Sequence, residues 1–411
     1  MTPKILLVTT RRWFATARLG TALAQAGCRV QAMCPSDHLL TKARAVHGTY
    51  PYSGLLPLRS LRAAIDAAEP DLLIPCDDLA ATHLHHLHAL AAQSATPSPE
   101  IVALLERSLG NPAYFSAVDS RNAFMSLARE QGVRAPKTAT VTTAGYLVSW
   151  LKENGLPAVL KVDGTHGGAG TEIVQSFDEA KNSFRKLDDG ILMSRVAKRA
   201  LLGRDLAVAR SWLQNDKAVV NIQSFVPGPD ASSSVACWQG EVLAMIQFEV
   251  LRKTNPKGSA SVLRLINNSE ISATVEKMVA RLGFSGLVGF DFILEEQTGH
   301  ASLIELNPRA TQTCHLRLGD GRDLVGALRS KISGQALQSV PRMTDHDVIA
   351  LFPQEWQKTP DSEFIRSAFH DVPWDEPELV RAGTQYRAPK GGWLSQGKWR
   401  EVRSKLSVRR A

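Results

Sequence analysis

The sequence predicts an α/β protein made of two or three packed subdomains. Its 411 residues are too many for one small core, and its hydrophobic (44%) and charged (21%) fractions are ordinary for a globular chain. Over the first 112 residues, patterns typical of buried strands and of helices alternate, which indicates a parallel sheet. Farther on, around residues 232–250 and 287–306, pairs of apolar runs flank polar turns, which indicates antiparallel hairpins.

The N-terminal domain, residues 1–112, alternates strands and helices from its first residues onward. The expected strands are Lys4–Thr9, Cys28–Cys34 and Asp71–Pro75, and the expected helices are Ala15–Ala26 and Leu58–Ala68. This order predicts a Rossmann-like parallel sheet with helices on both faces. The first turn lacks the G-x-G-x-x-G pattern, so we do not expect a dinucleotide site there.

Two features of this domain allow alternative interpretations. Asp77 and Asp78 follow a strand at the carboxyl edge of the sheet, where ligands bind, but capping of the next helix is the favoured interpretation. Four histidines lie within residues 83–88, but they form only two pairs three residues apart, His83 with His86 and His85 with His88, and not one common helical face. We therefore interpret this tract as an amphipathic helix with exposed imidazoles rather than as a metal site.

A linker helix is expected to open the next segment, residues 113–225. Asp119 or Ser120 caps this helix, Arg121 lies in its first turn, and Gly132 ends it.

A glycine-rich hairpin follows the linker helix in the same segment. A β-branched strand ends at Lys161, and a second strand begins at Thr171. The loop between them contains Gly164, Gly167, Gly168 and Gly170. Glycine lets backbone amides approach phosphate oxygens, and a lysine at the strand end can reach the same oxygens as a point charge.

The hairpin at residues 287–306, within a segment that we bound at 226–335, carries acidic side chains inside apolar strands. Asp291 lies in its first strand, and Glu305 and Asn307 lie on one face at the end of its second strand, just before Arg309. Two carboxylates and an amide oxygen suit Mg²⁺. The alternative, two surface acids on an edge hairpin, is less favoured because acids in apolar strands are costly unless they are paired or bind a metal.

Taken together, these segments resemble the ATP-grasp superfamily, which includes D-alanine–D-alanine ligase, biotin carboxylase and carbamoyl-phosphate synthetase. The resemblance rests on GFDFIL and LIELNPR in the second hairpin, on LKVDGTHGGAG in the first, on the linker helix, and on VVNIQSFVPGPD at residues 219–230. It covers roughly residues 1–335. It implies an ATP-grasp lid subdomain at 113–225 and a C-terminal ATP-grasp subdomain at 226–335, with ATP between them.

The resemblance also implies a role for each matched residue. Mg²⁺ (or Mn²⁺) would be held by Asp291, Glu305 and Asn307, and Arg309 would steady a phosphoryl group or a tetrahedral intermediate. The ATP phosphates would be bound by Arg121, Lys161, Gly167 and Gly168. Adenine would lie against a hinge formed by Gln223, Ser224, Phe225 and Val226, with Asp230 on the ribose. Gln223 replaces the usual Glu, but its amide can still accept from the adenine amino group.

The activity that this resemblance implies is ATP-dependent joining of a carboxylate to an amine through an acyl phosphate, with amino acids or peptides as the substrates expected by analogy. Three alternatives remain: a carboxylase or carbamoyl-phosphate type of enzyme that phosphorylates bicarbonate, an ATP-binding regulatory protein without turnover, and a nucleic-acid binder. Relatives are commonly dimers. Specificity is expected to depend on the N-terminal domain, residues 190–217 and the loop Leu251–Ser261. A further helix is expected over Cys314–Leu328.

The basic excess lies at the C-terminus, in an extension that we bound at 336–411. From Arg381 to Ala411 the chain has nine Lys or Arg and one acid, Glu401, which accounts for the whole net charge of +8. The rest is close to neutral, which argues against a nucleic-acid surface over the whole chain. The tail could contact nucleic acid, an acidic carrier protein or lipid, but a solvated or partly packed segment is the commoner case.

Composition also predicts a location. No apolar run approaches the length needed to cross a bilayer, and the first residues form a strand rather than a secretory signal. Five scattered cysteines without a C-x-x-C pair fit free thiols in a reducing compartment. We therefore expect a cytoplasmic protein.

Overall fold

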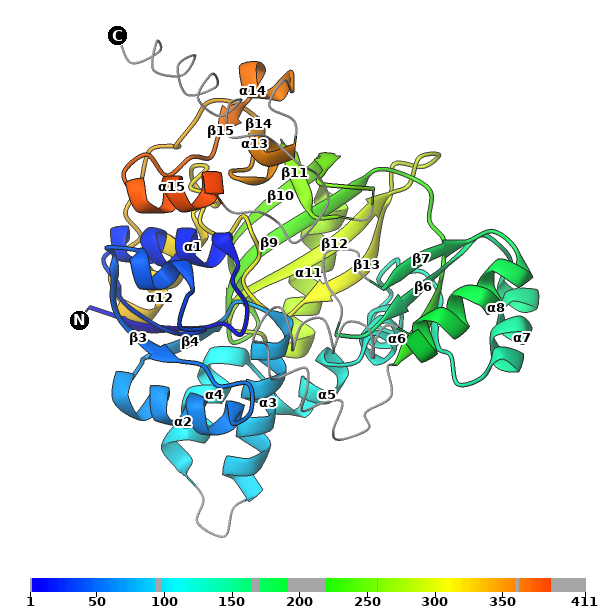
Figure 1. Cartoon of the computed structure of the whole chain (residues 1–411), viewed down its shortest axis with the longest axis horizontal. Helices are drawn as coiled ribbons and strands as arrows, with labels where there is room; N and C mark the ends of the chain where they lie inside the picture. The colour runs from blue at the N-terminus through cyan, green and yellow to red at the C-terminus, as the bar shows by residue number, and fades with distance from the viewer. Residues whose placement is uncertain are drawn as a thin grey trace.

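The computed structural model describes residues 2–93, 98–164, 170–190, 219–256, 258–358 and 362–385, and their strands form three sheets (Figure 1). The fold is a mixed α/β arrangement that begins with a parallel sheet, as the sequence predicts. The glycine-rich loop residues Gly167 and Gly168, the segment 191–218 and the tail from 386 lie outside the described residues. No helix in the described ranges is long and apolar enough to span a membrane.

The N-terminal domain contains a parallel sheet in the order β3-β2-β1-β4. Its strands are β1 Lys4–Val8, β2 Arg29–Cys34, β3 Val46–Pro51 and β4 Leu72–Pro75; its helices are α1 Phe14–Gln25, α2 Pro57–Ala68, α3 Asp78–Gln93 and α4 Pro99–Leu109. Ile5 and Leu7 share a core with α1, whereas Leu6 and Val8 share another core with α2, α3 and α4. Both faces of β1 are therefore buried, which explains its unbroken apolar run.

A second sheet, which we call the lid sheet after the predicted subdomain in which it lies, has the order β5-β8-β6-β7 and stands to one side of the molecule, with α7 and α8 on its outer face (Figure 1). Its strands are β5 Thr138–Thr140, β6 Ala158–Val162, β7 Thr171–Val174 and β8 Val220–Ser224; the helices of this segment are α5 Phe115–Val118, α6 Arg121–Glu130, α7 Ala144–Asn154 and α8 Phe177–Arg185. The linker helix and the glycine-rich hairpin thus lie where the sequence predicts them.

The largest sheet has the order β13-β12-β9-β10-β11-β14-β15. Its strands are β9 Asp230–Trp238, β10 Glu241–Lys253, β11 Ala260–Ile266, β12 Gly286–Leu294, β13 Ala301–Asn307, β14 Val348–Ala350 and β15 Phe369–His370; the accompanying helices are α11 Ser269–Leu282, α12 Leu324–Ser333, α13 Gln354–Lys358, α14 Phe364–Ser367 and α15 Pro377–Gln385. One face packs on α11, and the other shares a core with α12 and with α1 of the N-terminal domain. This shared core fixes the N-terminal domain against the sheet.

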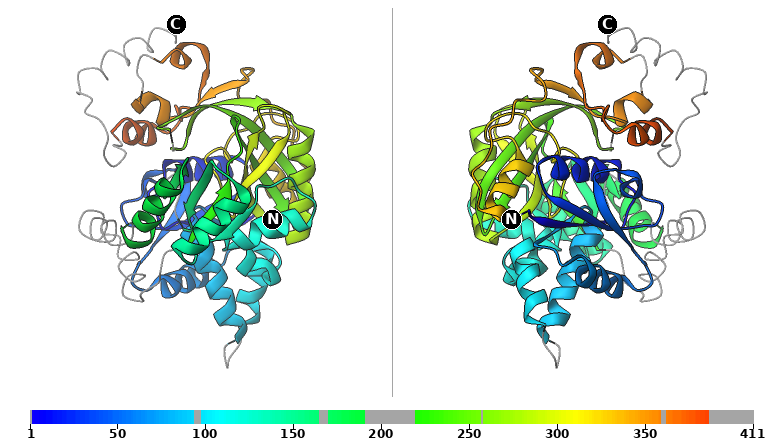
Figure 2. Two further views of the ribbon diagram at one scale, coloured as in Figure 1. Left: turned by 90° about the vertical axis from the view of Figure 1, so that its right-hand side faces the viewer. Right: turned by 90° about the vertical axis from the view of Figure 1, so that its left-hand side faces the viewer.

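The C-terminal segment extends this sheet instead of standing apart from it. β14 pairs with β11, and β15 pairs with β14. α15 lies beside α1 (Figure 1, Figure 2), and the fully buried Asp371, just after β15, pairs with Arg18 of α1 and with His315. The boundary that we draw at residue 336 stays a prediction, but its C-terminal side contributes strands to the sheet on its N-terminal side.

Three expectations were wrong in detail. The helix expected over Cys314–Leu328 begins only at Leu324. Gly319 and Gly321 take positive φ angles (99° and 69°), which are not helical. Asp323 then caps the helix, because its Oδ1 accepts from the backbone N–H of Gly326 at 2.9 Å. The loop Leu251–Ser261 is shorter than expected, since β10 continues to Lys253 and β11 begins at Ala260. The imidazoles expected to be exposed include two that are buried, His85 and His88, because carboxylates and Phe115 surround them.

Candidate active site

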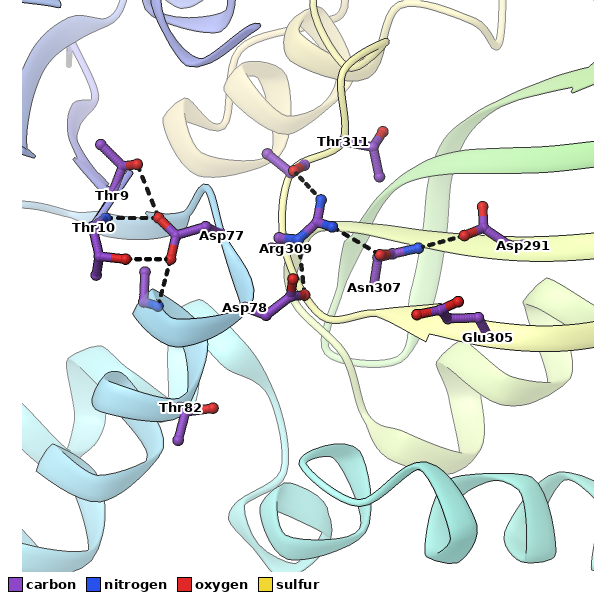
Figure 3. Close-up of polar contacts among 12 residues, drawn as sticks. Thr9, Thr10, Asp77, Asp78, Thr82, Asp291, Glu305, Asn307, Arg309 and Thr311 are labelled. Carbon is purple, nitrogen blue, oxygen red and sulfur yellow. Dashed lines mark hydrogen bonds and ion pairs between the residues drawn. The ribbon is translucent and has the colours of Figure 1, made fainter. Parts of the chain in front are cut away.

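The hairpin β12–β13 brings the predicted metal-binding side chains together. Asp291 pairs directly with Glu305 in the strand register, and Gly289 pairs with Asn307. The amide Nδ2 of Asn307 donates to Asp291 Oδ2 at 3.0 Å (Figure 3). Phe290 and Phe292, which alternate with Asp291, are fully buried in the core beneath. The two-residue period of the strands thus separates an apolar face from a polar one.

Two cations from the preceding segment approach Glu305. Arg121, the first residue of α6, donates from Nη2 to Glu305 Oε1 at 2.9 Å, and its Nε lies 3.5 Å from Asp163 Oδ1. Lys161 in β6 is buried, and its Nζ lies 3.5 Å from the carbonyl oxygen of Ile304. Burial and the charge of Arg121 lower the pKa of Lys161 to about 8, so the ammonium form still predominates at neutral pH.

The two facing carboxylates have opposite electrostatic environments. Burial, and then the charge of Glu305, raise the pKa of Asp291. Burial also acts to raise the pKa of Glu305, but Arg121 and Lys161 outweigh it and hold that pKa well below its usual value. Glu305 is therefore already compensated by protein cations, whereas the raised pKa of Asp291 shows that its carboxylate is less fully compensated.

This donor set fits a hard divalent cation. Two carboxylates and an amide oxygen converge, and an ion beside Asp291 would relieve the repulsion that raises its pKa. Within the described ranges no cluster of three His, Cys, Asp or Glu side chains forms a metal site, so an ion here would need the amide oxygen of Asn307 as well. Because Asn307 directs its Nδ2 toward Asp291 and its Oδ1 toward Arg309, its amide would have to turn to coordinate beside Asp291.

The guanidinium of Arg309 contacts a carboxylate, an amide and an aromatic ring. Its Nε donates to Asp78 Oδ1 at 2.8 Å and its Nη2 donates to Asn307 Oδ1 at 2.9 Å (Figure 3). Its guanidinium also lies 4.7 Å from the ring centroid of Trp13. In addition, the backbone N–H of Ala310 donates to the carbonyl oxygen of Pro75 at 2.9 Å, at the end of β4. The N-terminal domain therefore sets the position of this arginine.

The acids after β4 have separate roles. Asp77 is buried and accepts from the backbone N–H of Ala80 (3.0 Å), which confirms helix capping, and it also accepts from Thr9 and Thr10 (Figure 3). Asp78 instead pairs with Arg309. Asp78, Asp163 and Trp13 were not predicted from the motifs as partners of the site arginines. For Asp163 a signal was present, because it lies two residues after Lys161 at the end of a strand.

The predicted nucleotide hinge continues from β8. Gln223 is buried within the lid sheet, where its Nε2 donates to Thr138 Oγ1 at 3.1 Å, while Phe225 is exposed after the strand ends. Farther along, Asp230 opens β9 and pairs with Lys253 at 2.6 Å. Ser224 and Val226 are partly buried between these points. The roles of Gln223, Ser224, Phe225, Val226 and Asp230 toward a nucleotide stay predictions.

Comparison with known proteins relates part of the chain to a known domain. A family model described as the ATP-grasp domain matches residues 124–313. The carbamoyl phosphate synthase large chain of Gemmatimonas aurantiaca is 23% identical over 279 residues, which are 66% of this chain and 23% of that one. The chain thus spans about a quarter of the length of the curated relatives it matches.

Solved structures share the fold. The N5-carboxyaminoimidazole synthetase of Staphylococcus aureus, solved with ADP, has a TM-score of 0.57 at 13% identity and covers 82% of this chain and 78% of its own. The L-amino acid ligase of Bacillus licheniformis has a TM-score of 0.54 at 15% identity and covers 82% and 75%. Residues 124–313 thus match the ATP-grasp domain, as the motifs of this region imply.

Proposed function

We propose that the chain is an ATP-dependent ligase that activates a carboxylate as an acyl phosphate and joins it to an amine. The observation that carries this proposal is the convergence of Asp291, Glu305 and Asn307 with three cationic side chains. Two of these cations lie within the region that matches the ATP-grasp domain, and Arg121 lies just before it. The likeness to an L-amino acid ligase supports an amino acid or a peptide as the substrate. The free, buried state of all five cysteines supports a reaction in the cytoplasm.

The first step is transfer of a phosphoryl group from ATP. An oxygen of the substrate carboxylate attacks the γ-phosphorus, the bond from that phosphorus to the β–γ bridging oxygen breaks, and ADP leaves with the electron pair. Arg121 and Lys161 neutralise phosphate oxygens from the lid side. Asp291, Glu305 and Asn307 would hold Mg²⁺ (or Mn²⁺), which supplies positive charge beside the transferring group.

The second step uses the acyl phosphate. The lone pair of the amine attacks the acyl carbon, the bond between that carbon and the phosphate oxygen breaks, and phosphate leaves while the amine releases a proton. Arg309 would neutralise the departing phosphate or the tetrahedral oxygen, and its fixed orientation between Asp78 and Trp13 favours such positioning. No nucleophile from the protein is needed.

A second candidate is a reaction in which bicarbonate takes the place of the carboxylate. The match to carbamoyl phosphate synthase chains and the likeness to an N5-carboxyaminoimidazole synthetase favour it. The same residues would then activate bicarbonate as carboxyphosphate. A regulatory protein without turnover is less favoured, because such a protein would have no need to retain both acids and Asn307.

The test measures ADP and phosphate release in the presence of MgATP. Amino acids are supplied singly and in pairs, and bicarbonate is supplied alone and with each amine. Release that requires a carboxylate and an amine together supports the ligase. Release that requires bicarbonate supports the second candidate instead, and binding of MgATP without release under any condition contradicts both enzymatic proposals.

A further inference from the structure

Helix α3 contacts both arginines of the candidate site, one directly and one through an intermediary. Its first residue, Asp78, accepts from Arg309 Nε at 2.8 Å. One and two turns later, Thr82 and His85 contact Asp119: Thr82 Oγ1 lies 3.3 Å from Asp119 Oδ1, and His85 Nδ1 lies 2.9 Å from Asp119 Oδ2. Figure 3 shows Asp78 and Thr82 along this helix, beside the hairpin that carries Glu305.

Asp119 lies at the break between two helices. Its backbone N–H donates to the carbonyl oxygen of Phe115 at 3.0 Å and ends α5. Ser120 then takes an extended conformation (φ −114°, ψ 114°) and caps α6, whose first residue is Arg121. Because only Ser120 separates Asp119 from Arg121, fixing the carboxylate of Asp119 fixes the origin of α6.

Arg121 depends on such placement. Its side chain is only 12% exposed, and it reaches between Glu305 and Asp163. Among the residues that the structure describes, its Nη1 is buried and has no hydrogen-bond partner. A buried guanidinium N–H without a partner is costly, and a phosphate oxygen is a suitable acceptor for it.

The imidazole of His85 is itself held rigidly. It is buried and stacks on Phe115, with ring centroids 4.2 Å apart and an angle of 19° between the planes. The stacking fixes the ring plane, and the contact with Asp119 fixes the direction of Nδ1 within that plane. His85 can therefore hold Asp119 in one position without reorganisation.

A second pair of the same chemistry lies one turn farther along α3. His88 Nε2 lies 3.0 Å from Glu106 Oε1, and the ring of His88 meets the edge of Phe115 at 5.3 Å. Glu106 belongs to α4, which carries none of the candidate site residues. His88 therefore offers a matched control: it has the same residue type, helix and aromatic neighbour as His85, without the connection to Arg121.

We propose that His85 and Asp119 are positioning residues for Arg121. Through the carboxylate of Asp119, α3 sets where Arg121 presents its guanidinium to Glu305 and to the ATP phosphates. The inference rests on the proposed function, in which Arg121 contacts nucleotide. It makes α3 the common support of Arg121 and Arg309, the arginines on the two sides of the carboxylate pair.

The test compares MgATP affinity, by titration calorimetry, with thermal stability in a set of full-length variants. His85→Leu removes the donor to Asp119, whereas His85→Asn keeps an N–H near the position of Nδ1. Asp119→Ala removes the acceptor, and Arg121→Ala measures the nucleotide contact itself. His88→Leu is the control for loss of a buried imidazole.

We expect His85→Leu and Asp119→Ala to weaken MgATP binding by about fivefold to tenfold, since each loses a hydrogen bond to a charged group. His85→Asn should stay within about twofold of wild type on the same reasoning, and His88→Leu should lower the melting temperature without changing the affinity. Equal weakening by His88→Leu and His85→Leu, or wild-type affinity in Asp119→Ala, would overturn the inference. Wild-type affinity in Arg121→Ala, or no MgATP binding by wild type, would instead overturn the proposed nucleotide site on which it rests.

Discussion

Glu305→Gln is the substitution that separates the role of this side chain in turnover from its role in folding. It keeps the shape of the side chain and removes one negative charge from the hairpin face. In the structure Glu305 faces Asp291 and accepts from Arg121 at 2.9 Å. The substitution thus removes the charge that compensates Arg121 and replaces one of the two proposed carboxylate ligands of the metal ion with a neutral amide.

The expected cost in stability is modest. Removing one partner of a fully buried ion pair costs about 3–5 kcal/mol, but the side chain of Glu305 is 30% exposed, so solvent screening reduces the cost to about 1–2 kcal/mol. The loss of repulsion against Asp291 offsets part of that. The expected cost in turnover is much larger, about a thousandfold, because several kcal/mol of charge stabilisation in phosphoryl transfer depend on the metal ion.

The assay measures ADP release at saturating MgATP and as a function of Mg²⁺ concentration, with the substrates that support turnover by wild type. Replacing a charged ligand with a neutral one should raise the Mg²⁺ concentration for half-maximal activity by about 10-fold to 100-fold. Glu249→Gln, which removes an acid paired with the exposed Arg264 on the same sheet, is the control and should behave as wild type. Undiminished ADP release from Glu305→Gln would refute the assignment of this site.

Three further predictions concern the surroundings of the site. Asp78→Asn should lower kcat by about a hundredfold without weakening MgATP binding. Arg309 would lose the carboxylate that orients it, and a misplaced Arg309 would slow the chemical step. Steady-state kinetics measures kcat, and calorimetry measures MgATP binding. Gly289→Ala should lower the free energy of unfolding by about 1–3 kcal/mol and should lower turnover, because the new Cβ would lie 2.3 Å from a methyl carbon of Thr311. Urea unfolding measures this change in stability. Asp371→Asn should lower the free energy of unfolding by about 3–5 kcal/mol at pH 7, since it leaves Arg18 and His315 buried without their acid. Urea unfolding at several pH values measures this loss of stability.

The pH dependence of the last variant has a definite sign. Although burial acts in the opposite direction, His315 and Arg18 lower the pKa of Asp371 in the folded protein. Its stabilising contribution is therefore complete above the unfolded value of about 3.9 and is lost as the pH falls through the folded value. The deficit of Asp371→Asn relative to wild type should therefore narrow as the pH falls below about 4, and a constant deficit would contradict this assignment.

Matched substitutions control for general effects on charge. Asp66→Asn removes an acid from an exposed pair with Arg62 and should leave kcat unchanged, in contrast to Asp78→Asn. Asp375→Asn changes an exposed contact with Gln25 instead of the buried contacts of Asp371. It should lower the free energy of unfolding by less than about 1 kcal/mol. A loss of kcat in Asp66→Asn as large as that in Asp78→Asn would remove the case for a role specific to Arg309.

Those parts of the fold that depend on local pattern were predictable from the sequence. β1 and β4 are buried on both faces and have continuous apolar runs, and the alternation in β12 and β13 correctly placed Asp291 beside Glu305. β3 was not predicted, because it is an edge strand that contains Gly48 and ends at Pro51, with alternate residues exposed.

The contacts that complete the site could not be inferred from spacing alone. Asp78 and Arg309 are 231 residues apart in the chain, and Asp119 and His85 are 34 apart. The burial of His85 depends on Phe115, which belongs to a different helix. Such pairs form when segments that are distant in the sequence pack together. The sequence pattern of a single segment therefore cannot predict them.

Transfer of oxygen from the substrate to phosphate is the most direct test of the central proposal. A carboxylate labelled with oxygen-18 is supplied with MgATP and its amine partner, and the released phosphate is analysed by mass spectrometry. Activation as an acyl phosphate predicts one labelled oxygen in each phosphate, because the attacking carboxylate oxygen leaves with it. Turnover that yields unlabelled phosphate would contradict the acyl-phosphate mechanism and the roles proposed for the residues around Asp291.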